Sequence, residues 1–200
     1  GTYYLSSAED IKALSKIYNY LNDSITFILT NDIDMSGVTD LGEGLYSTKD
    51  ITIYGNGHVI KNYSASRGTL IDQAGELNIY DLGMENTSNA MIDKFSNGEI
   101  VNCYTTGSIN SITRETGCIG GFAHEIRGGT IKNCYSTCNV TGYTDLGGFA
   151  GYICRSEISD CYATGTVTGT AGGSKGGFVG ESTNTSYTKC FSTGNISVSG

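Results

Sequence analysis

The chain has 200 residues, a net charge of −8, 38% hydrophobic residues and 29 glycines, and it lacks proline and tryptophan. This length suits one domain or one elongated array, and the low share of charged residues (16%) excludes the composition of a disordered chain. The acidic balance argues against a nucleic-acid partner, which needs clustered Lys and Arg, and no run approaches the ~20 apolar residues of a membrane span.

The first predicted element is an amphipathic helix over residues 8–20. Ser7 precedes it and Asp10 follows three residues later, a spacing that approximates a capping box. One side of the segment carries the apolar residues Ala8, Ile11, Leu14, Tyr18 and Leu21. Stacked units leave an open hydrophobic end that a helix usually covers, so residues 1–22 are predicted to form an N-terminal cap.

Residues 23–98 contain strand-like segments at irregular spacing. The segment Ile51–Tyr54 leads into a Gly-Asn-Gly-His turn and then into Val59 and Ile60. Another segment, Leu77–Leu82, has the same character. We therefore expect irregular coils here, built on the same plan as the more regular second half.

Residues 99–200 contain two phrases that repeat in a fixed order. An Asn-Cys-Tyr-Ser-Thr-Gly phrase recurs with cysteines that step by 31, 27 and 29 residues, at Cys103, Cys134, Cys161 and Cys190. A Gly-Gly-Phe phrase lies between its copies, at Phe122, Phe149 and Phe178. Such periods are typical of stacked units, and no helical pattern separates the strands. The sequence predicts an all-β, parallel β-helix that forms one domain over residues 1–200 and continues beyond them.

Alternation within the repeated strand assigns its two faces. Cys103, Thr105, Gly107 and Ile109 are small or apolar, so this face and its copies are predicted to point inward, with the phenylalanines as stacked core aromatics. The opposite face is aromatic and hydroxylic and is predicted to face solvent. Corners that let the preceding isoleucines also point inward are expected at Asn102, Asn133 and Asp160, because Asn and Asp tolerate the left-handed conformation.

The seven cysteines favour buried free thiols. Their count is odd, no Cys-x-x-Cys pair occurs, and only two histidines are present, which argues against both a disulfide framework and a zinc site. Four of them occupy one repeat position, as a small buried hydrophobic residue does. No metal or other cofactor is predicted.

The chain resembles the GLUG-repeat family of bacterial surface proteins. The resemblance rests on Ser7–Leu14, Leu29–Ser36, Tyr54–Ile60 and both repeated phrases, with Cys138 in place of a Gly and Phe191 in place of a Tyr as departures. It implies a pectate-lyase-like, right-handed β-helix, export from bacteria, and occurrence as a module of large adhesin-like proteins. Some immunoglobulin A metalloproteases carry such a module beside their catalytic domain. The resemblance implies no shared catalytic residues.

The sequence does not bring together an active site. The acidic residues are scattered, and Arg127 and Arg155, expected near each other on adjacent coils, have no aligned acid pair. His58 and His124 lack triad partners at motif spacing and read as turn or surface residues. The segment Asn31–Asp34 reads as a structural turn, with a metal loop as the alternative. We expect no catalytic residues and no enzyme activity.

The outward stripe is the candidate binding surface. It consists of Tyr104, Tyr135, Tyr162, Phe191, Thr106, Thr137, Thr164 and Thr193. Such a stripe either stabilises adjacent strands or binds a host or bacterial glycan or protein. We expect a noncatalytic module, a stalk or an adhesin-like segment of a larger protein, that is extracellular or bound to the bacterial cell wall. The alternatives are a polysaccharide-active β-helix enzyme and the noncatalytic region of a secreted surface protease such as an immunoglobulin A metalloprotease.

Overall fold

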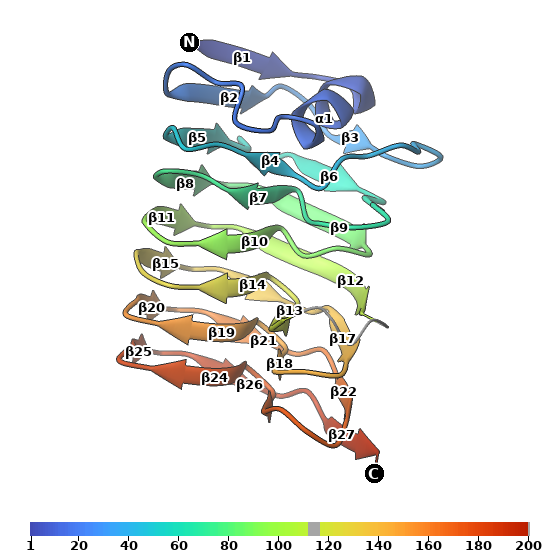
Figure 1. Cartoon of the computed structure of the whole chain (residues 1–200), viewed down its shortest axis with the longest axis vertical. Helices are drawn as coiled ribbons and strands as arrows, with labels where there is room; N and C mark the ends of the chain where they lie inside the picture. The colour runs from blue at the N-terminus through green and yellow to red at the C-terminus, as the bar shows by residue number, and fades with distance from the viewer. Residues whose placement is uncertain (112–116, 200) are drawn as a thin grey trace.

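The computed structural model is a parallel β-solenoid of about seven turns with one short helix near its N-terminus, and it describes residues 1–111 and 117–199 (Figure 1). After the first turn, successive turns add strands to three long sheets, and the last turns also add strands to a short fourth sheet. The strand pairs are parallel in every sheet, and the chain winds in a right-handed sense. The predicted right-handed parallel β-helix is confirmed.

Within the described residues, the strands form four sheets. The first sheet contains β1 (Thr2–Leu5), β2 (Ile25–Leu29), β5 (Ile51–Tyr54), β8 (Leu77–Tyr80), β11 (Gly98–Val101), β15 (Thr130–Lys132), β20 (Glu157–Ser159) and β25 (Ser186–Thr188). The second contains β4 (Leu45–Tyr46), β7 (Ile71–Gln73), β10 (Ile92–Phe95), β14 (Ala123–Ile126), β19 (Ala150–Cys154) and β24 (Val179–Thr183).

The other two sheets complete each turn. The third sheet contains β3 (Ile33–Asp34), β6 (Val59–Lys61), β9 (Gly83–Thr87), β12 (Tyr104–Asn110), β16 (Tyr135–Ser136), β17 (Asn139–Gly142), β21 (Tyr162–Ala163), β22 (Val167–Thr170), β26 (Phe191–Ser192) and β27 (Ile196–Ser199). The fourth contains β13 (Ile119–Gly120), β18 (Leu146–Gly147) and β23 (Lys175–Gly176).

The register of the first sheet shows how the turn length varies. Partners in successive turns are Thr2, Thr26, Thr52, Asn78, Glu99, Thr130, Glu157 and Ser186, so one turn takes 24, 26, 26, 21, 31, 27 and 29 residues. The turns before Glu99 thus differ in length from those of the repeated phrases. Strands nevertheless stay in register, because loops between the sheets absorb the difference.

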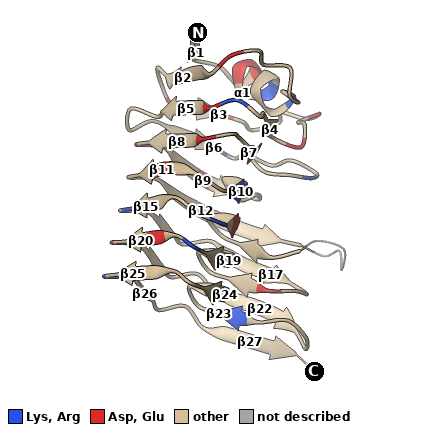
Figure 2. Cartoon of the chain, turned by 60° about the vertical axis from the view of Figure 1, so that its left-hand side comes forward, with Lys and Arg blue, Asp and Glu red and all other residues tan. Residues whose placement is uncertain are grey.

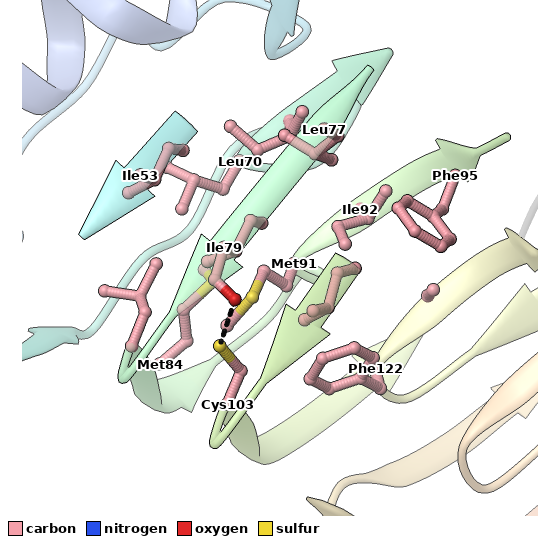
Figure 3. Close-up of a cluster of buried hydrophobic side chains, with 14 of the residues drawn as sticks. Ile53, Leu70, Leu77, Ile79, Met84, Met91, Ile92, Phe95, Cys103 and Phe122 are labelled. Carbon is pink, nitrogen blue, oxygen red and sulfur yellow. Dashed lines mark hydrogen bonds between the residues drawn. The ribbon is translucent and has the colours of Figure 1, made fainter. Parts of the chain in front are cut away.

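The core consists of columns of identical or similar side chains, one from each turn. Phe122, Phe149 and Phe178 stack with ring centroids 4.8 Å apart and interplanar angles of 5° and 4°. This spacing equals the distance between neighbouring strands, so each ring lies directly over the next. Figure 3 shows the Phe122 end of this column beside Met91, Ile92 and Phe95. The predicted aromatic core column is confirmed.

The repeated cysteines form a second buried column. Cys103, Cys134 and Cys161 are at most 1% exposed, and Cys190 is half-buried. Each thiol donates a hydrogen bond to a carbonyl of the preceding turn, such as that of Cys103 to the Ile79 carbonyl at 3.7 Å (Figure 3). The seven cysteines are free thiols; five are buried, and Cys118 and Cys190 are half-buried.

The corners between the first and third sheets have the predicted left-handed conformation. The φ angles are 57° at Asn102, 53° at Asn133 and 52° at Asp160, and Asp81 shares the conformation at 53°. The side chains also link consecutive turns: Nδ2 of Asn133 donates to Oδ1 of Asn102 at 2.6 Å, and Nδ2 of Asn102 donates to Oδ1 of Asp81 at 2.8 Å. Asn therefore serves both the corner and the stacking of turns.

The N-terminal helix is shorter than predicted. Helix α1 spans Ala8–Ser15, not residues 8–20, and Ser7 and Asp10 form the expected capping box. The chain leaves the helix because Tyr18 pairs in parallel with Tyr46 and Asn19 adopts a left-handed conformation (φ 52°). The helix follows β1 and lies beside β3 at the end of the array (Figure 1), where Ile11 and Leu14 join the core.

Burial in the last turn departs from the predicted alternation. Ile196 in β27 was assigned to the inward face but is 49% exposed, and Tyr187 in β25 is 38% exposed. Both lie on strands at the edge of their sheets, so no further turn packs against them. Val140 and Val167, which occupy the position of Ile196 in the two preceding turns, each lie between two strands and are fully buried.

Candidate functional site

The predicted stripe forms a continuous aromatic column on the third sheet. Tyr104, Tyr135, Tyr162 and Phe191 pair in register through β12, β16, β21 and β26. Their ring centroids are 5.0, 4.8 and 5.2 Å apart, with interplanar angles of 6°, 3° and 9°. The three tyrosines are half-buried, whereas Phe191 in the last turn is 55% exposed.

This stacking decides what the column offers to a ligand. Because the rings lie face to face, the faces of Tyr135 and Tyr162 are covered by their neighbours on both sides. A ligand along the column meets ring edges and hydroxyl groups, and stacking on an aromatic face is possible only at the Phe191 end, on the edge strand β26. The column therefore binds mainly through hydrogen bonds, if it binds a ligand.

The first ring of the column is held by the preceding turn. Tyr104 lies over Gly83, where an added Cβ would be 2.5 Å from the ring, so only glycine leaves room for it. Its hydroxyl donates to Oε1 of Glu85 at 2.8 Å. Burial, together with this carboxylate, raises the pKa of Tyr104 well above its usual range. Tyr104 is thus a fixed anchor, and the other tyrosine hydroxyls are the ones open to a partner.

The four threonines of the stripe differ in accessibility. Thr106 and Thr137 are half-buried, and Thr164 and Thr193 are exposed. The Thr106 hydroxyl already accepts a hydrogen bond from the Asn86 amide at 3.2 Å. The stripe is consequently most open in its last two copies, around Thr164, Phe191 and Thr193. Figure 2 shows that charged residues are spread over the turns, with long uncharged stretches between them.

A polar cleft that sequence reasoning missed lies over the second sheet. Its volume is about 620 Å³, and its lining includes Glu43, Arg67, Asp72, Asp93, Lys94 and Glu125. Ile71, Ile92 and Ala123 are register partners in β7, β10 and β14, so the residues that follow them, Asp72, Asp93 and His124, occupy equivalent positions on three successive turns. The 21-residue step between the two aspartates differs from the repeat period, which hid their alignment.

The environment of the cleft shifts the pKa values of the titratable groups that line it. Burial raises the pKa of Asp72 to about 6, with further contributions from the charge of Asp93 and a hydrogen bond to it. Burial also raises the pKa of Asp93. Desolvation lowers the pKa of His124 to about 4, so its imidazole is neutral at pH 7. The thiol of Cys118, whose pKa burial raises to about 11, is not a reactive nucleophile there.

The remaining candidates from the sequence have structural partners. His58 Nδ1 lies 3.3 Å from Oδ1 of Asp32, which also accepts a hydrogen bond from the Val59 amide. Asp34 accepts from Asn62 and Ser36, which lower its pKa to about 2. The prediction of a turn over Asn31–Asp34 is only partly right, because Ile33 and Asp34 form strand β3, and the side chains of Asp32 and Asp34 accept hydrogen bonds from the next turn. Among the described residues, no group of three His, Cys, Asp or Glu side chains is placed to hold a metal ion.

Arg127 and Arg155 follow the register partners Ile126 and Ile153 by one and two residues, so they lie on adjacent coils as expected. Nε of Arg127 donates to Oε2 of Glu125 at 2.5 Å, and the guanidinium lies 5.2 Å from the centroid of the Tyr152 ring. Arg155 is exposed at a corner with a φ of 52°. No helix in the described part of the chain has the length and apolar character needed to cross a membrane.

Comparisons with known proteins agree with this architecture. The model of the GLUG motif matches residues 142–168, which run from the end of β17 through one full turn into β22. The chain is also similar to a solved structure from Bacteroides ovatus described as a "putative immunoglobulin A1 protease", with 25% identity and a TM-score of 0.82. The similarity covers 98% of this chain and 67% of that one. No curated protein matches the chain. This protein is thus a parallel β-solenoid that carries the GLUG motif, in agreement with the resemblance seen in its sequence.

Proposed function

We propose that the chain is a noncatalytic module of a larger, exported bacterial surface protein, acting as a stalk or an adhesive segment. The GLUG motif and the similarity to the Bacteroides ovatus protein support a surface β-helix module. Stacked turns suit a stalk because each turn contacts only its neighbours, so length is gained without a larger core. An extracellular or cell-wall location and further domains of the same polypeptide are part of this proposal.

The observation that carries the adhesive role is the aromatic column on the third sheet. Four rings lie in register at intervals of about 5 Å along the axis, and three of them, Tyr104, Tyr135 and Tyr162, carry hydroxyls beside a row of threonines. Repeated hydroxyls at a fixed spacing suit hydrogen bonding to a host or bacterial surface glycan or to a partner protein. The net charge of −8 and the scattered charged residues argue against a nucleic-acid partner.

Variants that keep the stack and remove its hydroxyls test the binding surface. Changing both Tyr135 and Tyr162 to Phe retains the ring contacts, while Tyr54→Phe removes a stacked tyrosine hydroxyl from the first sheet as a matched control. Binding to glycan arrays and to immobilised host surface proteins is expected to fall at least tenfold in the double variant and to stay unchanged in the control. Unchanged binding by the double variant would exclude the column as the binding surface.

The alternative function is a polysaccharide-active enzyme. Asp72 and Asp93 are the pair of carboxyl groups that would have to serve as its catalytic residues. Glycoside hydrolases hold their two carboxyls about 5–9.5 Å apart, on either side of the scissile bond. Here the two aspartates follow register partners on adjacent strands of one sheet, which lie about 4.8 Å apart, so they do not face each other across a bound sugar, and this supports a noncatalytic role. Product formation from bacterial or host polysaccharides, abolished by Asp93→Asn, would establish the enzyme instead. The noncatalytic region of a surface protease is compatible with the proposal.

A further inference from the structure

The contact between β7 and β10 differs from the other contacts of the second sheet. These strands share a single register pair, Ile71 with Ile92. The later pairs in the same sheet, β10 with β14, β14 with β19 and β19 with β24, have three or four. On the other side of β7, the pairing with β4 contains a register shift. The backbone ladder is therefore thinnest where β7 meets its neighbours.

Two carboxyl groups face each other at this contact. Asp72 follows Ile71 and Asp93 follows Ile92, so the two carboxyls occupy neighbouring positions on adjacent strands, where each affects the pKa of the other. In residues 1–111 and 117–199, no N–H or O–H group donates a hydrogen bond to either carboxyl. Other aspartates have donors: Asp32 accepts from the Val59 amide, and Asp34 from Ser36 and Asn62. Two carboxyls can share a hydrogen bond only while one of them holds a proton.

The charges around the pair do not replace this proton. Lys94 on β10 is close enough to favour the charged forms of both aspartates, but it is exposed and has Glu125 of β14 as its register partner. Glu43, from the loop before β4, and Glu125 add negative charge. Arg67 lines the same cleft, and His124 on β14 is neutral above about pH 4. The environment is acidic on balance.

We propose that the β7–β10 contact is a pH-sensitive lock, in which one proton shared by Asp72 and Asp93 joins two turns in acid and its loss at neutral pH loosens them. The lock is part of the floor of the cleft, so its opening widens the cleft from below. Because β7 and β10 share only one register pair, loss of the shared proton is expected to weaken this contact more than any other in the second sheet. The rest of the second sheet, with more register pairs, stays closed.

The direction of the effect follows from the raised pKa of Asp72. A carboxyl whose pKa is higher in the folded chain than its ordinary 3.8 binds its proton more tightly in the folded state. The stabilisation is therefore complete below about pH 4 and is lost as the pH rises through about 6. Two pKa units correspond to at most about a hundredfold change in the opening equilibrium. Screening by water at this half-buried pair reduces the expected change to roughly tenfold.

Hydrogen exchange at two pH values tests the lock. After correction for intrinsic rates, the protection of amides in β7 and β10 is expected to fall roughly tenfold between pH 4.5 and pH 7.5, while that in β19 stays constant. In Asp93→Asn, the amide donates to Asp72 at either pH, so the change is expected to disappear. Glu157→Gln, which removes an exposed carboxyl on the first sheet, is the matched control and retains it. Equal protection at both pH values, or an unaltered change in Asp93→Asn, would overturn the proposal.

A second measurement keeps the proposal testable if the Asn variant does not fold. Carbon NMR of the carboxyl groups in the unmodified chain is expected to show the resonances of Asp72 and Asp93 moving together, with a midpoint near pH 6. Independent titration of both groups near pH 4 would show that no proton is shared and would refute the lock. Neither result bears on the aromatic column, so the two proposals stand or fall separately.

Discussion

Replacing Phe149 by Ala tests whether the turns are coupled through their stacked rings. Phe149 is fully buried, and its ring is stacked at 4.8 Å on both Phe122 and Phe178. Loss of a buried Phe side chain costs about 3–5 kcal/mol, and each aromatic pair adds about 0.5–1.5 kcal/mol beyond burial. We therefore expect the free energy of unfolding to fall by about 4–8 kcal/mol.

Phe178→Ala is the comparison that makes this prediction sharp. Phe178 is half-buried, and among the described residues it stacks face to face with Phe149 alone, while the Tyr187 ring lies nearly perpendicular to it with the centroids 6.1 Å apart. Its removal is expected to cost about 2–3 kcal/mol. If Phe149→Ala does not fold, Phe149→Leu, which mainly loses the two stacking contacts, is expected to cost about 1–3 kcal/mol. Urea unfolding followed by circular dichroism measures all three. A cost for Phe178→Ala equal to or above that of Phe149→Ala would refute coupling between neighbouring turns.

Other substitutions and a labelling experiment test local parts of the structure. Asn133→Ala loses a hydrogen bond and strains a left-handed corner, so the free energy of unfolding in urea is expected to fall by about 1–3 kcal/mol. Asn133→Gly loses the same hydrogen bond without the strain and is expected to fall by less; equal losses for the two variants would exclude the strain. Ser7→Ala removes the helix cap and is expected to cost about 1 kcal/mol, measured by thermal unfolding, whereas no change would contradict the capping role. A thiol reagent at pH 7.5 is expected to label the half-buried Cys190 first and Cys134 last, by mass spectrometry, because burial raises the pKa of Cys134 well above its usual range; early labelling of Cys134 would contradict its place in the core.

The regular half of the fold was predictable because its side chains repeat. Cys134 and Phe149 each recur at the same place in neighbouring units, and stacked turns put such residues in one column. The corner at Asn133 was predictable for a local reason, since few residue types adopt the left-handed conformation. The predicted helix end at residue 20 was wrong. Tyr18 and Leu21 continue the apolar pattern of the helix, but Tyr18 pairs with Tyr46 and the helix ends at Ser15.

The cleft could not be predicted because it depends on an irregular turn. Asp72 and Asp93 are 21 residues apart, and only the observed register places them side by side. The aromatic column was predicted as a stripe from Tyr104 to Phe191, yet its exposure was not, because alternation does not reveal that each ring covers the face of the next. Its role in binding stays a prediction. The columns were therefore predictable from the periodicity of the sequence, whereas the cleft depends on the lengths of the loops between the sheets.

The stacking of turns in register is the claim on which the account depends most. The position of Thr26 in the register of the first sheet is occupied by Thr130 four strands away and by Ser186 six strands away. At about 4.8 Å per strand, the backbone distances are about 19 Å and 29 Å. Pulsed electron paramagnetic resonance between spin-labelled unnatural amino acids at Thr26 and each of the other two positions measures both. The account predicts that the second distance exceeds the first by about 10 Å; equal distances, or a shorter one to Ser186, would contradict it.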